Sequence, residues 1–212
     1  MGEVIMLAER RAARRVRTLR AHARSRVEFL FDLGCPFSYL AAERVERAFD
    51  DVIWTPASAE ALACGAPERL ERTRAAAERR AAELRLPLVW PERFPEAVPA
   101  AMRVAAHASE HGRGAAFVLA AGRLAFCGGF DLDDPETLAE AAAAAGIGID
   151  GCLDAAGHAG RDGAIEASGR RLLAAGADRL PALRVGPSLF WGEDRVAEAG
   201  AAARMRAAAV SH

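Results

Sequence analysis

One cysteine, Cys35, stands in a context that could support thiol chemistry. It follows a β-rich run at residues 27–31 and precedes Pro36 and a helical pattern over residues 38–49, and proline suits the first turn of a helix. A thiol at a helix N-terminus faces the positive end of the helix dipole and unpaired N–H groups, which stabilise a thiolate. Ser38 lies one turn further on, where its hydroxyl can reach the sulfur. The sequence therefore predicts a reactive Cys35 with a pKa lowered to about 3.5–7.5.

The same residues allow a purely structural interpretation. Cys35 could be a small packed residue, and Ser38 could simply cap the helix. The other cysteines, Cys64, Cys127 and Cys152, show neither a CxxC pair nor zinc-ligand spacing. We expect these three to be reduced, buried hydrophobic residues, and we expect no metal site.

The elements around Cys35 follow a β-α-β pattern. Hydrophobic spacing predicts the helix after Cys35, and runs of β-formers predict four short strands, at residues 27–31, 52–55, 182–185 and 188–191. A last helix is predicted over residues 195–209. Strands at both ends of the chain indicate that its terminal parts fold onto one sheet.

The segment between the strand pairs carries almost only helical signals. Apolar spacing and end signals predict five helices, over residues 67–86, 96–110, 114–126, 135–145 and 161–175. We therefore expect an α/β fold in which residues 26–62 and 176–212 form one domain. Residues 63–175 are then an α-helical insertion domain.

Composition limits the classes of function. The chain has 212 residues, of which 52% are hydrophobic, and a net charge of −1. A chain of this length buries roughly 70% of its unfolded surface without a disulfide or metal. No segment approaches the ~18 apolar residues of a membrane span, and the neutral balance argues against nucleic acid as a partner. All 28 basic residues are arginine, which we interpret as codon bias.

The N-terminal segment is the one strongly charged part of the chain. Residues 1–26 hold eight arginines against Glu3 and Glu9. Such an arm could contact nucleic acid or anionic lipid, or it could be a solvated extension comprising residues 1–25. It lacks the apolar core of a secretory signal, so we expect a cytoplasmic protein.

The residues around Cys35 resemble the start of the DsbA-like thioredoxin-fold superfamily. The resemblance is closest to 2-hydroxychromene-2-carboxylate isomerases and kappa-class glutathione transferases, whose motif reads Phe-Asp-x-x-Ser-Pro-Tyr/Phe-Ser-Tyr/Trp-Leu. The matching run here is Phe31-Asp32-Leu33-Gly34-Cys35-Pro36-Phe37-Ser38-Tyr39-Leu40. Further matches follow in the family's order, at Phe94-Pro95, Ala101-Met102-Arg103, Gly112-Arg113, residues 130–135, Leu180-Pro181 and residues 190–195. The resemblance spans about residues 26–205.

The resemblance implies a thioredoxin-like fold with a large α-helical insertion and a site for a thiol. It implies that Pro181 is a cis-proline and that the backbone of Leu180 pairs with glutathione or another low-molecular-weight thiol. It also implies that Glu193 and Asp194, at the start of the last helix, bind the ammonium of the thiol's γ-glutamyl group. On the residues alone, Asp194 could be an ordinary helix cap, and Pro181 could be a proline at a strand start.

The resemblance also assigns Phe37 and Arg103 to the substrate side of the site. An arginine on an amphipathic helix is otherwise typical of a surface salt bridge. The isomerases carry Phe-Pro-x-Asn where this chain has Glu96-Ala97 after Phe94-Pro95. That departure puts the specific hydroxychromene substrate in doubt.

Two further departures concern the thiol site itself. Cys35 stands where the isomerases and transferases have a serine that hydrogen-bonds the sulfur of glutathione. Ser38 stands where DsbA-type oxidoreductases have a second cysteine, so no disulfide can form within residues 35–38. Any redox role of Cys35 must then pass through a mixed disulfide.

We therefore expect an enzyme that uses glutathione or another small thiol, as an isomerase or transferase on an aromatic or conjugated organic acid. One alternative is a monothiol disulfide oxidoreductase acting through Cys35. Another is a thioredoxin-fold binding protein whose catalysis has lapsed. Codon usage of this kind occurs in bacteria that use thiols other than glutathione, so the thiol stays open. A small-molecule substrate is expected, and a homodimer is compatible with the sequence.

Overall fold

The computed structural model describes residues 26–60, 62 and 67–210 of the chain, without the side chains of residues 67–69 and 210. The Arg-rich N-terminal extension expected at residues 1–25 and the cysteine at position 64 lie outside the described residues.

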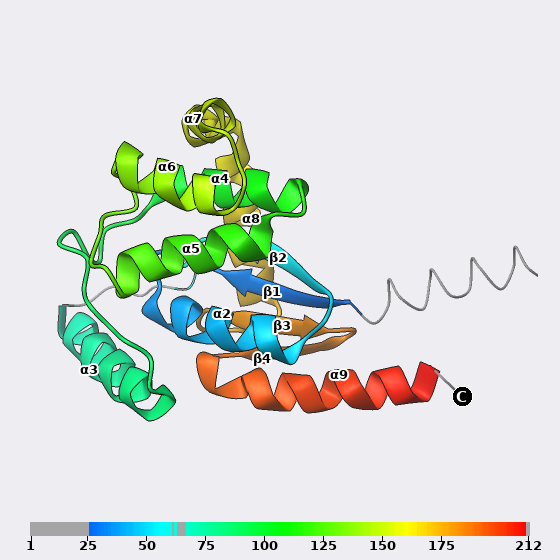
Figure 1. Ribbon diagram of the computed structural model, residues 1–212. Helices are drawn as coiled ribbons and strands as arrows, with labels where there is room; N and C mark the ends of the chain where they lie inside the picture. Colours follow the sequence, from blue (N-terminus) through cyan, green and yellow to red (C-terminus); the bar gives the residue numbers. More distant parts are fainter. Residues whose placement is uncertain (1–25, 61, 63–66, 211–212) are drawn as a thin grey trace, which may run out of the picture.

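The two ends of the chain share a four-stranded sheet in the order β2-β1-β3-β4 (Figure 1). Strand β1 runs parallel to β2 and antiparallel to β3, and β3 pairs with β4 in a hairpin. The strands are β1 (Val27–Phe31), β2 (Val52–Pro56), β3 (Ala182–Val185) and β4 (Ser188–Trp191). All four strands and their common sheet confirm the sequence prediction.

Helices cover both faces of this sheet. Helices α2 (Pro36–Ala48) and α9 (Val196–Val210) lie on one face, and α8 (Asp162–Ala174) crosses the other (Figure 1). Successive side chains of a strand point to opposite faces of the sheet, so the apolar residues of β1 can contact helices on both faces. Phe29 and Phe31 are fully buried in the main core with α2, whereas Leu30 joins a second cluster with Leu172 of α8.

The remaining helices lie between β2 and α8 in the chain. They are α3 (Pro67–Leu84), α4 (Pro99–Glu110), α5 (Gly114–Phe126), α6 (Pro135–Ala144) and α7 (Ile149–Gly157). Helices α4 to α7 stack beside the β2 edge of the sheet, and α3 lies apart from them, near α2 (Figure 1). The structure thus confirms an α/β fold with a helical insertion.

The helix boundaries follow local signals closely. Asp134 caps α6 by accepting the N–H of Glu136 at 2.7 Å, and α5 has the predicted bounds. The helix expected from Glu96 begins at Pro99 instead, because the backbone of Val98 is not helical. Within the described residues, no helix is both long and apolar enough to cross a membrane.

Candidate functional site

Cys35 occupies the N-cap position of α2, directly beyond the carboxyl end of β1. Its backbone is extended (φ −96°, ψ 116°), and Pro36 fills the first helical turn as predicted. The thiol is half-buried and its Sγ lies 3.9 Å from the carbonyl oxygen of Leu180. The Leu180–Pro181 peptide bond is cis. Two predicted segments that are 145 residues apart therefore meet at the sulfur.

Ser38 supports the loop that carries Cys35. Its side chain is buried, with 2% of the residue exposed, and its hydroxyl accepts the N–H of Asp32 at 3.2 Å. The hydroxyl also hydrogen-bonds the Cys35 thiol, and that bond lowers the pKa of the thiol. The alternative that Ser38 caps the helix is wrong, because no side chain caps α2 and the Ser38 hydroxyl supports the preceding loop instead.

The prediction of a lowered Cys35 pKa is wrong. Burial raises the pKa of the thiol from 9.0 to about 11, with a further upward contribution from the negative charge of Asp32. The backbone N–H groups of Ser38 and Phe37 and the Ser38 hydroxyl act in the expected, opposite direction but are outweighed. Cys35 is therefore a protonated thiol at neutral pH.

Asp32 belongs to the site but was not among the predicted site residues. Its carboxylate accepts the N–H of Gly34 and the N–H of Ala59, each at 2.8 Å. Burial raises the pKa of Asp32, while these two N–H bonds act to lower it. The carboxylate ties the loop before Cys35 to the segment after β2. Its position directly after a buried strand is the sequence feature that could have identified Asp32 as a site residue.

A cavity of about 380 Å³ opens beside the cis-proline. It brings together four of the residues that the resemblance had assigned to the site, Phe37, Leu180, Glu193 and Asp194. Pro181 is fully buried behind it. The cavity wall also includes the arginines Arg79, Arg80 and Arg179, none of which the sequence had singled out.

Glu193 does not present a free carboxylate to this cavity. It is 4% exposed and is paired with Arg44 of α2 and with Arg80 of α3, whose Nε lies 2.5 Å from its Oε2. Arg44 also donates to the Glu193 backbone carbonyl at 3.0 Å. The predicted ammonium-binding role of Glu193 is therefore corrected to a structural one, because two guanidinium groups already hold its carboxylate.

Asp194, the next residue, is exposed at the cavity rim. In the described part of the chain its carboxylate has no hydrogen-bonded or ion-paired partner, and it does not cap the short helical turn Glu193–Arg195. Gly192 has a φ of +100°, and a Cβ there would lie 2.6 Å from Oδ1 of Asp194 and 3.0 Å from Nε of Arg179. Glycine is thus required for this turn to place Asp194 at the cavity.

Arg103 lies outside the cavity. Its guanidinium makes a two-pronged ion pair with Asp162 at the start of α8, with both N···O distances at 2.7 Å. It also donates to the carbonyl of Ala156 at 3.0 Å. The substrate role that the resemblance implied is corrected to a structural one, because all these contacts hold α4 against α7 and α8.

A narrow aromatic cleft flanks the other side of the Cys35 loop. Its free volume is only about 20 Å³, and its lining includes Gly34, Phe94, Phe126 and Phe130. Phe130 is 54% exposed, so its ring can move without disturbing the core. Ala97, which stands where the isomerases have asparagine, lines this cleft, and Glu96 beside it forms an ion pair with Arg93 at 2.6 Å.

The other described cysteines differ from each other. Cys152 is 1% exposed, as expected for a small buried hydrophobic residue. Cys127 is only half-buried, which corrects the expectation that it is a core residue. Its sulfur lies 3.1 Å from the hydroxyl of Tyr39.

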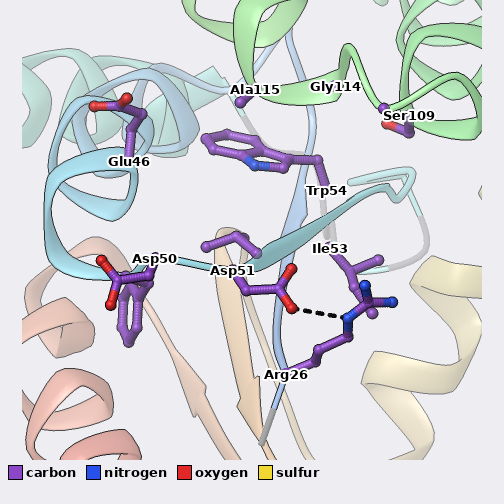
Figure 2. Close-up of a pocket in the computed structure, with 12 residues that line it drawn as sticks. Arg26, Glu46, Asp50, Asp51, Ile53, Trp54, Ser109, Gly114 and Ala115 are labelled. Atoms are coloured by element: carbon purple, nitrogen blue, oxygen red, sulfur yellow. Dashed lines mark hydrogen bonds and ion pairs between the residues drawn. The ribbon is translucent and has the colours of Figure 1, made fainter. Parts of the chain in front are cut away.

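A larger cavity, of about 540 Å³, lies at the opposite end of β1 (Figure 2). Arg26 pairs with Asp51 at 2.9 Å on its wall, and the carboxylates of Glu46 and Asp50 lie nearby (Figure 2). Its residues include no thiol and none of the predicted site residues. Cys35 does not itself line the 380 Å³ cavity, but Leu180, whose carbonyl oxygen lies 3.9 Å from the Cys35 sulfur, does.

The fold and the cis-proline beside a helix-capping cysteine define a thioredoxin-like protein with a helical insertion. Residues 26–201 match the family of DSBA-like thioredoxin domains, and the chain belongs to this family. No curated protein matches the sequence.

Solved structures give the same fold. A 2-hydroxychromene-2-carboxylate isomerase matches with a TM-score of 0.73 and 18% identity, over 88% of this chain and 99% of that one. A "probable DsbA oxidoreductase" from Streptomyces coelicolor matches with a TM-score of 0.67 and 20% identity, over 86% and 90% of the two chains. At these identities the likeness establishes the fold, and isomerases and oxidoreductases both occur among the neighbours.

Proposed function

We propose that this chain is a thiol-dependent enzyme, an isomerase or transferase that uses glutathione or a related small thiol on an aromatic or conjugated organic acid. The observation that carries the proposal is the cavity joining Leu180, next to the Cys35 sulfur, to the unpaired carboxylate of Asp194. These groups suit the two ends of one short thiol peptide.

The residues present fit such a thiol. The Leu180 backbone at the cis-proline offers peptide hydrogen-bonding groups, and Asp194 offers a charge-assisted bond to an ammonium group. Arg179 and Arg79 at the cavity wall suit carboxylates of the same ligand. A bound thiol would supply the sulfur nucleophile that adds to a conjugated carbon of the substrate and later leaves.

Cys35 would act in this scheme as a neutral hydrogen-bond donor. Its raised pKa of about 11 keeps the proton on Sγ at neutral pH, and an S–H can donate to a nearby thiolate. This is the role that the resemblance gives to serine at this position. Ser38 would act through Cys35, whose sulfur its hydroxyl hydrogen-bonds, and the N-terminal end of the α2 dipole would favour negative charge on the ligand's sulfur.

Substitutions at Cys35 test the proposal directly. We expect Cys35→Ser to retain thiol-dependent turnover of a conjugated organic acid, because serine keeps a donor. Cys35→Ala should lose about 10²-fold or more, as when a positioned donor is removed. Complete loss in Cys35→Ser, with a mixed disulfide on wild-type Cys35 by mass spectrometry, would instead favour the monothiol oxidoreductase.

The ligand site is tested by calorimetry with reduced glutathione. Asp194→Asn should weaken binding by about 1.5–3 kcal/mol, the value of a hydrogen bond to a charged group. Asp150→Asn is a matched control, because Asp150 is an exposed carboxylate on α7, away from the cavity. Equal affinities in wild type and Asp194→Asn would remove the assigned ammonium site. If neither glutathione nor another thiol binds the wild type, the protein is a lapsed thioredoxin-fold binding protein.

A further inference from the structure

Three metal-ligating side chains gather on the last turn of α4, in a part of the molecule that the proposed function does not use. They are His107, Glu110 and His111, whose ligand atoms all lie within 4.8 Å of one another. Residues one turn apart share a helix face, so the i, i+3 and i+4 spacing brings them together. The sequence prediction of no metal site rested on cysteine spacing and did not consider them.

The two histidines are arranged as a chelating pair. Their rings lie 4.2 Å apart between centroids. The Nδ1 of His111 lies 2.8 Å from the backbone carbonyl of His107, and because a carbonyl only accepts, Nδ1 carries the proton. In the neutral ring this leaves the lone pair on Nε2 for a metal. A hydrogen bond from the second ring nitrogen to a carbonyl is the usual support of a metal-bound histidine.

The groups around the three side chains include both negative and positive charges. Glu110 uses Oε1 to bind Arg161 at 2.5 Å, which orients the carboxylate and leaves Oε2 for a ligand bond. The C-terminal end of α4 adds partial negative charge. The positive charge of Arg161 acts against a cation, and the Glu110 carboxylate offsets it.

Helix α7 packs close to the His107 ring. Gly151 of α7 faces this ring, and because glycine has no Cβ, it leaves room beside Nε2 that a Cβ at 3.8 Å would fill. His107 is half-buried while Glu110 and His111 are exposed.

We propose that His107, Glu110 and His111 form a binding site for a divalent transition metal of the Zn²⁺ class. Two imidazoles and one carboxylate are a recurrent zinc ligand set with a fourth position left open. Zinc–ligand bonds of 2.0–2.1 Å require tetrahedral ligand atoms about 3.3 Å apart. The ligand atoms now lie within 4.8 Å of one another. Rotation of the exposed side chains of His111 and Glu110 can shorten these distances to the value that zinc requires. A bound ion would tie α4, through Glu110 and Arg161, to the turn before α8.

Titration calorimetry of the full chain with zinc chloride tests the site. We expect one ion per chain in the wild type and at least a tenfold loss of affinity in both His107→Ala and His111→Ala. His158→Ala is the matched control, because His158 is an exposed histidine outside the cluster, and it should bind zinc as the wild type does. Thermal unfolding without metal checks that every variant is folded.

Cysteines could bind zinc independently, so a second measurement identifies the ligands. The absorption spectrum with cobalt(II) chloride should lack a thiolate charge-transfer band and should be unchanged in Cys35→Ser. Absence of zinc binding in the wild type would overturn the proposal. So would unchanged affinity in both histidine variants, or a thiolate band that disappears in Cys35→Ser. None of these results bears on thiol binding at Asp194.

Discussion

Slow alkylation of Cys35 at neutral pH is the sharpest consequence of its environment. A pKa of about 11 in place of 9.0 reduces the thiolate fraction near pH 7 about 100-fold, because each unit of pKa changes this fraction tenfold. Only the thiolate reacts with iodoacetamide. We therefore expect folded Cys35 to react about 100 times more slowly than the same residue in the unfolded chain.

Peptide-resolved mass spectrometry between pH 6.5 and 9.5 measures this rate for each cysteine separately. In the folded protein the Cys35 rate should rise about tenfold per pH unit across the whole range. In guanidinium chloride it should level off near the ordinary thiol pKa of 9.0. A folded-state rate that levels off below pH 8 would refute the argument from burial.

The Asp32 charge gives the same experiment a second arm. Asp32→Asn removes one of the groups that raise the Cys35 pKa, so alkylation at a fixed pH should become faster. Asp51→Asn removes a carboxylate at the opposite end of the sheet, where Asp51 pairs with Arg26, and should leave the rate unchanged. Equal rates in the wild type and both variants would show that Asp32 does not act on the thiol.

The raised pKa also predicts a pH dependence of stability. The folded state holds the Cys35 proton more tightly than the unfolded state, so this stabilisation is fully present below pH 9.0 and is lost between pH 9.0 and about 11. Denaturant unfolding of wild type and Cys35→Ser across this window should show a steeper decline for the wild type. Parallel curves would contradict the raised pKa.

Three further substitutions test the supporting contacts. Glu193→Gln leaves two partly exposed guanidinium groups without a full counter-charge and should cost about 2–3 kcal/mol, seen as a Tm lower by about 5–10 °C. Gly192→Ala should cost about 1–2 kcal/mol and weaken glutathione binding, because its Cβ would displace Asp194; calorimetry checks both. Arg103→Ala should cost about 1–3 kcal/mol, show coupling to Asp162→Asn in a double-mutant cycle, and leave thiol affinity unchanged.

The elements that were predicted well are those whose signals are local. The bounds of α5 and the cap at Asp134 follow from apolar spacing and a side chain that bonds its own helix. Helix α7 was not predicted as a separate element, because it holds nine residues and includes Gly151 and Gly157. Its stability comes from packing against α4 and α6 rather than from its own sequence.

The electrostatics of the site could not be predicted in the same way. The helix-capping position of Cys35 is local and was correct, but burial of its thiol depends on the fold, which brings Leu180, 145 residues away, against the sulfur. The environments of Glu193 and Asp194, the two acidic residues before α9, also depend on residues distant in sequence. Arg44 and Arg80, which bury Glu193, are 149 and 113 residues distant in sequence. In so short a turn no periodicity tells which of two neighbouring carboxylates faces inward.

The two carboxylates, Glu193 and Asp194, differ in burial and pairing, and this difference makes the two ends of the cavity chemically distinct. Glu193 is buried and neutralised by two arginines, whereas Asp194 remains exposed and unpaired within the described chain. Near Leu180, burial of the neighbouring Cys35 thiol is enough to raise its pKa. A thiol peptide has the matching polarity, since a sulfur is cheaper to bury than an ammonium group, which must be paired when it leaves water. In the proposed complex the sulfur therefore points inward to Cys35, and the charged amino end stays at the rim beside Asp194.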